Sequence, residues 1–415
     1  MQTQRRSAVI YAIIFLDLLA FGIVVPQLGI YAKHFGASAL TQGLLVGCYS
    51  AMQFLFAPLL GRWSDRIGRR PVLLISLLTS FAGHVLFALA HSLPLLFAAR
   101  LIDGLGGANV STAQAYLSDV TPNERRAKAM AAVGMSFGMG FILGPVVGAV
   151  LAPWGTHHWG AYGGNLAIGL VAAGCSLATL LLTALWLPES LPAERRHDAE
   201  RPLRLIDLAS LRSAWGMPAV RSLLLVNLIS TAGFAVLHAI LSYFLIDQLH
   251  LDVTSPEAVK LAQRATGIVF GWIGIVSFLS QGAVHGIGHR VGESRLLRLG
   301  LVLQTVGLAL LPLGGSISRL LLWCLPLAIG SALANALLPA LLTLHSPPTR
   351  RGEVLGLSSS LGSIGRIGGP LFGGWLYDLW PHAPFAVGVV LTLVAVAVSW
   401  NVPESAVLCQ DPASL

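Results

Sequence analysis

The chain has 415 residues, of which 55% are hydrophobic and 11% are charged, and its mean hydropathy is +0.75. Soluble domains carry about 25% charged residues, so this composition excludes a soluble globular protein and indicates an integral membrane protein. The net charge of +8 does not indicate a nucleic-acid partner, because the basic residues lie in loops between apolar segments. The four cysteines show no metal-ligand spacing, so we expect no metal site, no disulfide framework and no cofactor.

Twelve apolar segments are long enough to cross a membrane as helices, since a span needs about 20 mostly apolar residues. The longest polar segment, 188–218, separates two sets of six spans and is expected to be a cytoplasmic linker. We therefore predict an all-α membrane fold with two six-helix bundles, 1–187 and 219–402, followed by a tail, 403–415. In chain order the predicted spans cover residues 8–31, 42–61, 71–91, 94–118, 126–152, 161–187, 219–248, 264–284, 294–314, 317–344, 352–378 and 382–402.

The positions of Lys and Arg predict the orientation, because basic residues concentrate on the cytoplasmic side of membrane proteins. If the N-terminus is cytoplasmic, the outer side carries only Lys33, Lys260, Arg264 and Arg319. We therefore expect a multi-pass protein of the cell inner (plasma) membrane with both termini in the cytoplasm.

The two sets of spans are related by an internal repeat. The tripeptide 66–68 (Arg-Ile-Gly) recurs as 290–292 (Arg-Val-Gly), and the Gly-Pro pair at 144–145 recurs at 369–370. Each set also closes on Pro-Glu-Ser, at 188–190 and 403–405. A duplication of six membrane helices is typical of secondary transporters, whose substrate site lies between the halves near the membrane midplane.

A charged segment separates the second and third spans and reads Gly-Arg-Trp-Ser-Asp-Arg-Ile-Gly-Arg-Arg-Pro from Gly61 to Pro71. It resembles the loop between helices 2 and 3 that marks the major facilitator superfamily. Arg100-x3-Gly104-x3-Ala108 resembles the helix-4 motif of that family. The glycine-rich run 134–148, ending in Gly144-Pro145-x2-Gly148, resembles the helix-5 motif of its antiporters.

The chain is thus similar, over nearly its whole length, to the twelve-helix drug/proton antiporters. The residues around these motifs resemble the tetracycline/proton antiporter group most. The resemblance implies a monomer whose partners are a small-molecule substrate, protons and membrane lipids. That group carries intramembrane acids in helices 3 and 9, whereas this chain has Gly83 or His84 and Gln304 there. A metal–tetracycline complex is therefore not the expected substrate.

The resemblance also implies a conformational latch at the charged loop. Asp65 would lie against the cytoplasmic start of helix 11 near Gly352, where a helix N-terminus favours an anion. Arg69 or Arg70 would bridge Asp65 to Asp119 when the transporter faces outward. The other expected members of this latch are Gly61, Arg66 and Gly68.

Ionisable residues inside spans are costly and therefore indicate function. Asp17 lies in an apolar stretch of the first span and is our first candidate for the proton-binding residue. A structural acid permanently paired with an Arg is the alternative. Arg100 and Asp103 lie one turn apart and can share a helix face, so Asp103 could carry the proton instead and Arg100 could tune the coupling.

Arg366 lies about 15 residues into its span, about 20 Å from the cytoplasmic end at 1.5 Å per residue. It could pair with Asp17 or Asp103 across the halves, or contact an anionic substrate. Polar residues of other spans either line a substrate cavity with Arg366 or hold helices together without a ligand. These candidates for substrate binding are Gln53, His84, Asn109, Gln114, Asn227, His238, Gln304 and Asn335.

Small residues in spans 5 and 11 allow close helix packing, and prolines there favour kinks that could rock or seal the outer side. These packing and gating candidates are Gly140, Gly144, Pro145, Gly148, Gly369, Pro370 and Gly373.

The sequence predicts a secondary active transporter, with proton-coupled efflux of a small amphipathic or drug-like compound as the first hypothesis. A proton-coupled symporter of a metabolite and a lipid or lysolipid transporter of the same fold are the alternatives. A membrane receptor is disfavoured because the chain has no large soluble domain. No nucleophile, metal or phosphate-binding motif indicates an enzyme or ATP-driven transport.

Overall fold

The computed structural model describes residues 2–107, 109–160, 162–192, 208–347 and 350–404, and this part of the chain is helical without a β-strand. Within its helices, the side chains of residues 2–7, 123–128, 130, 131, 134, 137, 138, 141, 208–210, 238 and 283–290 lie outside the description.

The first half contains seven helices, which are α1 (Gln2–His34), α2 (Ala39–Ile67), α3 (Arg69–Ala88), α4 (Leu93–Gly106), α5 (Asn109–Val120), α6 (Asn123–Trp159) and α7 (Gly163–Trp186). The second half contains α8 (Leu208–Trp215), α9 (Pro218–Gln248), α10 (Pro256–Val291), α11 (Glu293–Leu310), η2 (Leu311–Leu313), α12 (Ile317–Leu344), α13 (Arg351–Leu379) and α14 (Ala383–Ser399).

Each of the twelve predicted spans coincides with helical structure, which confirms the predicted fold class. The span predicted at 94–118 is divided between α4 and α5, because α4 ends at Gly106 and α5 begins at Asn109. By length and composition, nine segments of the described chain can cross a membrane, and the apolar helix α14 is shorter.

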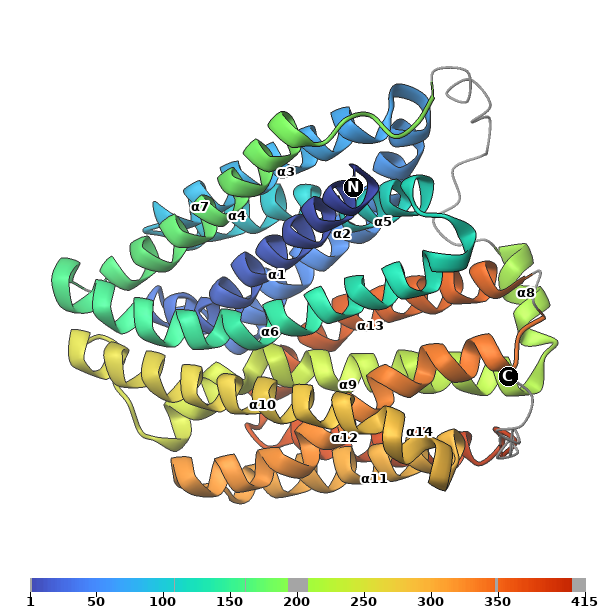
Figure 1. The fold of residues 1–415 in the computed structure, drawn as a ribbon. Helices are drawn as coiled ribbons and strands as arrows, with labels where there is room; N and C mark the ends of the chain where they lie inside the picture. Colours follow the sequence, from blue (N-terminus) through green and yellow to red (C-terminus); the bar gives the residue numbers. More distant parts are fainter. Residues whose placement is uncertain (1, 108, 161, 193–207, 348–349, 405–415) are drawn as a thin grey trace.

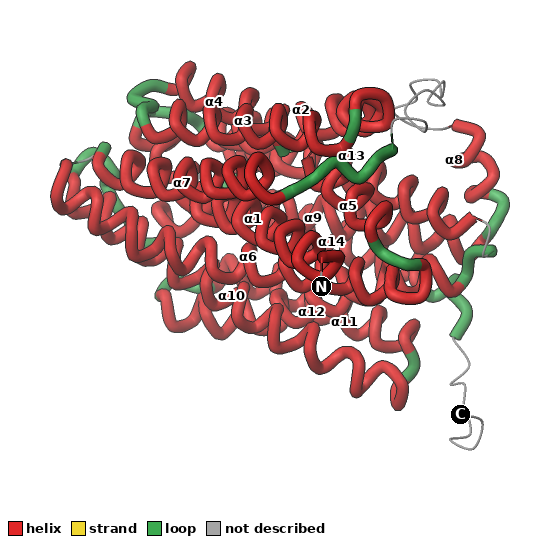
Figure 2. The backbone as a smooth tube through the Cα atoms, turned by 45° about the horizontal axis from the view of Figure 1, so that its top comes forward, coloured by secondary structure: helices red, strands yellow, loops and turns green. Residues whose placement is uncertain are grey.

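The helices run roughly parallel or antiparallel to one another and form two bundles, α1–α7 above and α9–α14 below in Figure 1. Figure 2 shows that short loops connect them at the two ends of the molecule. Helix α8 lies at one end, which we call the terminal side; the other end is the distal side. The α2–α3 connection lies on the terminal side, whereas the α1–α2 connection is distal.

The repeat recognised in the sequence has the same backbone form in both bundles. Gly68 joins α2 to α3 with φ 111°, and Gly292 joins α10 to α11 with φ 91°. A positive φ is readily adopted by glycine alone, so each bundle makes the same tight reversal between its second and third spans.

The glycines of α6 pack within the first bundle, against α1. A Cβ added to Gly144 would lie 2.5 Å from the Cα of Gly22. Gly369 and Gly373 of α13 repeat this arrangement against α9, since a Cβ on Gly369 would lie 2.5 Å from the carbonyl oxygen of Ala232. These glycines of the predicted helix-packing runs therefore bring neighbouring helices of one bundle together.

The contacts between the bundles use a second set of glycines, which the sequence analysis did not single out. Gly43 of α2 approaches α13, where an added Cβ would lie 2.8 Å from the carbonyl carbon of Pro370. Gly267 of α10 approaches α6, where an added Cβ would lie 2.7 Å from the Cα of Ala149. Gly43 and Gly47 recur as Gly267 and Gly271, 224 positions later, which is the offset between the tripeptides 66–68 and 290–292.

The bundles meet toward the distal side and separate toward the terminal side. Near the terminal ends of α2 and α13, a Cβ added to Gly61, Gly352 or Gly356 would meet no atom of the described chain within 4 Å. The structure is thus closed at the distal side and open between the bundles at the terminal side.

Candidate functional site

Arg100 and Asp103 of α4 form a buried ion pair in the first bundle. The Arg100 Nη1 donates to Asp103 Oδ2 at 2.8 Å, and the two residues are only 2% and 4% exposed. The guanidinium also lies over the ring of Tyr49 from α2, 4.4 Å from its centroid, and over Phe21 from α1 at 5.6 Å. Stacking of this kind stabilises a desolvated cation, so Arg100 is held by three helices.

Asp17 of α1 is buried but forms no ion pair with any described residue. Its carboxyl group lies beside the side chain of Asn109 at the start of α5 and within electrostatic range of Asp103. Asn109 is buried too, and its Nδ2 has no hydrogen-bond partner in the described chain. A permanent Asp17–Arg pair, one alternative from the sequence, is therefore not formed, since Arg100 pairs with Asp103.

His84 of α3 completes this group, which we call the central cluster (Asp17, Tyr49, His84, Arg100, Asp103 and Asn109). Its Nδ1 lies 2.9 Å from Ser176 Oγ, and its Nε2 lies 3.8 Å from Asp103 Oδ1. The neighbouring Gly83 permits this approach, because a Cβ there would lie 2.7 Å from the Asp103 Cβ.

Gln53 of α2 contacts the point at which α4 ends. Its Nε2 donates to the carbonyl oxygen of Gly107 at 2.7 Å. A carbonyl at a helix end lacks an intrahelical donor, so Gln53 satisfies a group that the interruption after Gly106 exposes.

Arg366 of α13 is the charged residue that the second bundle contributes to this region. Its Nη2 donates to Ser363 Oγ at 2.8 Å, and it interacts electrostatically with Tyr49. It forms no ion pair with a described carboxylate, so neither of the cross-bundle pairs with Asp17 or Asp103 is present. Asn227 of α9 lies near it and donates to the carbonyl oxygen of Ser358 at 2.9 Å.

The remaining substrate candidates are not brought into the central cluster. Gln304 is buried where α11 packs on α12, Asn335 is exposed, and Gln114 is partly exposed without a hydrogen bond to the described chain. The side chain of His238 lies outside the described residues. The described chain brings no three His, Cys, Asp or Glu residues together as a possible metal site.

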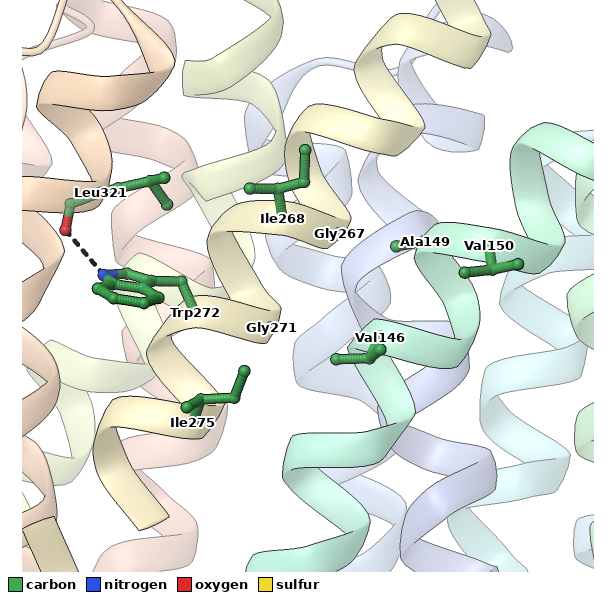
Figure 3. Close-up of a pocket in the computed structure, with 9 residues that line it drawn as sticks. All are labelled: Val146, Ala149, Val150, Gly267, Ile268, Gly271, Trp272, Ile275 and Leu321. Atoms are coloured by element: carbon green, nitrogen blue, oxygen red, sulfur yellow. Dashed lines mark hydrogen bonds between the residues drawn. The ribbon is translucent and has the colours of Figure 1, made fainter. Parts of the chain in front are cut away.

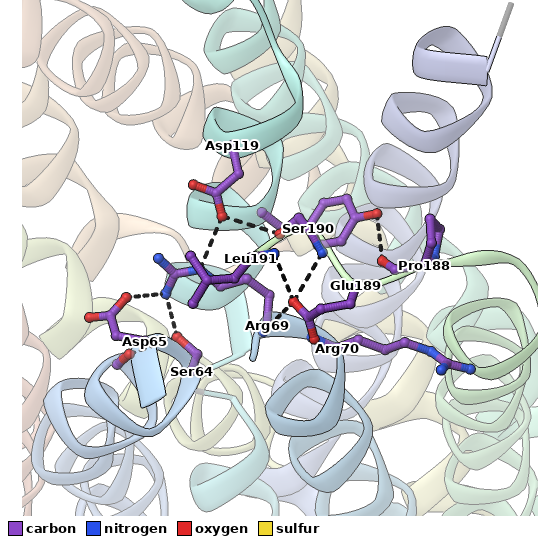
Figure 4. Close-up of polar contacts among 11 residues, drawn as sticks. Ser64, Asp65, Arg69, Arg70, Asp119, Pro188, Glu189, Ser190 and Leu191 are labelled. Atoms are coloured by element: carbon purple, nitrogen blue, oxygen red, sulfur yellow. Dashed lines mark hydrogen bonds and ion pairs between the residues drawn. The ribbon is translucent and has the colours of Figure 1, made fainter. Parts of the chain in front are cut away.

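A polar network joins the α2–α3 loop to α5 on the terminal side (Figure 4). The Arg69 Nη1 lies 2.6 Å from Asp65 Oδ1, and its Nε lies 3.2 Å from Asp119 Oδ2. Arg69 thus bridges these two acids in a conformation that is open on the terminal side, whereas the resemblance implied the bridge for the outward-facing state. Asp65 does not reach Gly352 at the start of α13, because the space around Gly352 is open in this conformation.

Glu189 is a member of this network that the sequence analysis did not assign. Its carboxylate accepts the backbone N–H groups of Arg69 at 2.8 Å and Arg70 at 3.2 Å, which caps the first turn of α3 (Figure 4). It also accepts the N–H groups of Ser190 and Leu191, each at 3.0 Å. The available signal in the sequence was the repeated Pro-Glu-Ser tripeptide, which contains Glu189. Its carboxylate stabilises α3 because a negative charge near a helix N-terminus is favourable.

The second copy of this tripeptide binds differently. Glu404 pairs with Arg295 of α11, whose Nη2 lies 2.5 Å from Glu404 Oε2. The hydrogen bond from Arg295 holds the pKa of Glu404 below its ordinary value. The carbonyl oxygen of the preceding Pro403 accepts a hydrogen bond from Ser294 Oγ at 2.8 Å, so the segment that follows α14 is attached to the start of α11.

A group of polar contacts, which we call the distal seal, joins the two bundles on the distal side. Lys33 of α1 pairs with Asp247 of α9, which also accepts the hydroxyl of Tyr377 at 2.7 Å. Asp378 of α13 accepts the first N–H groups of α2, and the hydroxyl of Tyr243 donates to the Ala37 carbonyl at 2.8 Å. No pattern in the sequence pairs these residues.

Two bundles of six spans, repeated in sequence, with polar and charged groups between helices, define a transporter of the major facilitator type. In the comparison with protein families, the model described as the Major Facilitator Superfamily matches residues 10–330 and 223–407. The chain belongs to the Major Facilitator Superfamily and is a membrane transporter of that family.

The relatives include drug-resistance proteins. The chain is 31% identical to the tetracycline resistance protein, class C, of Escherichia coli, with 95% of this chain and 96% of the relative covered. It is 27% identical to multidrug resistance protein 2 of Bacillus subtilis, with 92% of each covered. The crystal structure of the human organic anion transporter MFSD10 (TETRAN) is also similar, with 27% identity, TM-score 0.68, and 96% and 99% of the two chains covered.

Proposed function

We propose that the chain is a proton-coupled exporter of a small amphipathic or drug-like compound and works by alternating access. The observation that carries this proposal is the buried Asp17 carboxyl group, which has no cationic partner in the described chain. An intramembrane acid without a fixed ion pair can exchange a proton without breaking a buried salt bridge, which would be costly. The similarity to tetracycline and multidrug resistance proteins supports export.

The terminal side is the cytoplasmic side in this proposal, because it carries most of the Lys and Arg residues. The conformation described then faces the cytoplasm and admits the compound between the bundles. A proton reaching Asp17, or Asp103 in its place, from the distal side stabilises this inward-facing state, and its later release accompanies the return. The protein acts as a monomer of the inner (plasma) membrane, with the bundle, linker and tail boundaries predicted from the sequence.

The test uses inverted membrane vesicles with an imposed pH gradient and ethidium as the fluorescent cationic probe. We expect Asp17→Asn to lose gradient-driven accumulation while retaining ethidium binding. The matched control is Asp252→Asn, which changes an exposed acid of the distal α9–α10 loop. Unchanged gradient-driven transport by Asp17→Asn would exclude Asp17, and loss in Asp103→Asn alone would assign the proton to Asp103.

Arg366 favours a second candidate function, the transport of an organic anion. Its guanidinium has no described carboxylate partner, and the similar human protein is named as an organic anion transporter. When Asp17 is protonated and Arg100 stays paired with Asp103, Arg366 is the uncompensated charge of this region and would attract an anion. Carboxyfluorescein transport that is lost in Arg366→Gln, with no ethidium transport by the unaltered protein, would favour this candidate.

A further inference from the structure

An apolar groove of about 270 Å³ lies on the seam between the two bundles (Figure 3). It is formed by α6 of the first bundle and by α10 and α12 of the second. Its lining is hydrophobic and includes Val146, Val150, Gly267, Ile268, Gly271 and Trp272.

The groove lies beside a close contact between α6 and α10. Gly267 and Gly271 allow this contact, because a Cβ added to Gly267 would lie 2.7 Å from the Ala149 Cα and one added to Gly271 would lie 3.0 Å from a methyl group of Val146. The side chains of Val150 and Ile268 line the groove from the two helices (Figure 3). The indole of Trp272 forms a fixed wall, since its Nε1 donates to the Leu321 carbonyl at 2.9 Å. Val150 is 67% exposed and Ile268 is 48% exposed, so the groove opens outward from the helices.

Because the groove opens outward from the helices, its surroundings indicate which kind of molecule occupies it. These residues belong to helices of a membrane-spanning bundle, so their exposed faces meet lipid. Small-molecule sites combine an apolar lining with several polar orienting groups and reach about 300–1,000 Å³. This groove is smaller and lacks such groups, which fits a hydrocarbon chain better than a transported compound.

Basic side chains continue the same helix face toward the distal edge. Lys260, Arg264 and Ile268 are spaced by four residues along α10. At 1.5 Å per residue, Arg264 lies about 6 Å and Lys260 about 12 Å beyond Ile268 toward the distal edge. On α6, His157 lies at the matching height, because its Nδ1 is 3.5 Å from Lys260 Nζ. Arg264 and His157 are exposed. The nearest acid along α10, Glu257, lies almost one turn further toward the distal edge.

We propose that this seam binds one anionic phospholipid of the distal leaflet. One acyl chain lies in the groove between α6 and α10, and the headgroup phosphate lies against Lys260, Arg264 and His157. The separation of about 6–12 Å between the cations and the groove is short enough for one lipid molecule to occupy both. The site is independent of the central cluster and of the transported substrate.

The experiment titrates delipidated, detergent-purified protein with phosphatidylglycerol and phosphatidylcholine and counts bound lipids by native mass spectrometry. We expect one tightly retained phosphatidylglycerol and weaker retention of phosphatidylcholine. Lys260→Gln and Arg264→Gln should each weaken phosphatidylglycerol binding about fivefold, given the usual attraction of a basic residue to an anionic lipid surface. Arg319→Gln, an exposed cation on the same distal side, is the matched control and should leave binding unchanged.

The groove itself is tested with Val150→Trp and Ile268→Trp, which fill it from exposed positions. Val390→Trp on α14 is the control, because Val390 is 59% exposed and lies outside the groove. Gel filtration and thermal unfolding verify folding of every variant. Loss of lipid binding in the groove variants, but not in Val390→Trp, supports the proposal.

Three results would overturn it. Equal lipid binding by the groove variants and the unaltered protein would show that no acyl chain occupies the groove. Complete displacement of the lipid by glycerol phosphate would identify the basic group as a simple anion site. Loss of ethidium binding in the groove variants, with lipid binding intact, would assign the groove to the transported compound.

Discussion

Asp378 of α13 accepts the backbone N–H of Ala39, the first residue of α2, at 2.9 Å across the seam between the bundles. Its second carboxylate oxygen accepts the N–H of Leu40, also at 2.9 Å. The first N–H groups of a helix have no intrahelical acceptor, and the positive end of the helix dipole attracts a carboxylate. The second bundle thus caps a helix of the first, and separation of the bundles at the distal side would uncap α2.

Asp378→Asn should therefore weaken the distal seal. An amide supplies one acceptor without charge, and the loss of a charged cap costs about 1 kcal/mol, or about a fivefold shift in a two-state population. The shift should favour the distal-open state. Spin labels at His91→Cys, in the distal α3–α4 loop, and at Leu313→Cys, at the end of η2, should report this shift as a longer distance in double electron–electron resonance.

The control for this measurement is Asp252→Asn, an exposed acid on the same side that makes no contact across the seam. An unchanged distance distribution in Asp378→Asn would show that the cap does not contribute to closure.

The sequence predicted the spans well because span length and hydropathy are local properties. It also placed Arg100 and Asp103 on one helix face, and the structure pairs them. It could not pair Asp378 with Ala39, because these residues are 339 positions apart in the sequence and their contact depends on how the two bundles come together. Arg366 was ambiguous for the same reason, since its possible carboxylate partners lie in the other bundle.

The glycines of the seam give a second prediction about conformation. A Cβ at Gly43 would lie 2.8 Å from the Pro370 carbonyl carbon, closer than packed atoms tolerate, so α2 or α13 must move. Overpacking of this kind costs about 1–3 kcal/mol. We expect Gly43→Ala to lengthen the same spin-label distance and to lower thermal stability.

The matched controls for Gly43→Ala are Gly61→Ala on the same helix and Gly174→Ala on α7, because an added Cβ meets nothing within 4 Å at either position. Both should keep the distal side closed. Equal effects of all three substitutions would mean that helix propensity, and not the seam contact, determines the outcome.

Glu189 should matter more for stability than its repeat counterpart Glu404. Glu189 accepts four backbone N–H groups around the start of α3, and loss of such a charged cap costs about 1–2 kcal/mol. Glu404 is itself 53% exposed and binds only side chains of α11, those of Arg295 and Arg298. We expect Glu189→Gln to lower the apparent melting temperature in detergent by roughly 1 °C for each kcal/mol lost, and Glu404→Gln to leave it nearly unchanged.

The pH dependence of Glu404 has a definite sign. Its pKa is lowered in the folded protein by Arg295, so its contribution is present above the ordinary value of 4.5 and is lost as the pH falls through the lowered value. Any stability difference between Glu404→Gln and the unaltered protein should therefore disappear in acid. A difference that grows as the pH falls would contradict this assignment.

Asp65→Asn tests the latch on the terminal side. In the conformation described, Asp65 is 44% exposed and paired with Arg69, while the start of α13 stands apart. When the terminal side closes, the resemblance implies that Asp65 meets the N-terminus of α13, where the helix dipole stabilises its charge. The neutral amide should lose that stabilisation, about 0.3–1 kcal/mol, and disfavour the closed terminal side. Ethidium transport should therefore slow severalfold with unchanged ethidium affinity, measured by fluorescence polarisation.

Asp65→Glu, which keeps the charge, should retain more transport than Asp65→Asn. A large loss of affinity with a normal transport rate would place Asp65 in substrate binding and remove the latch.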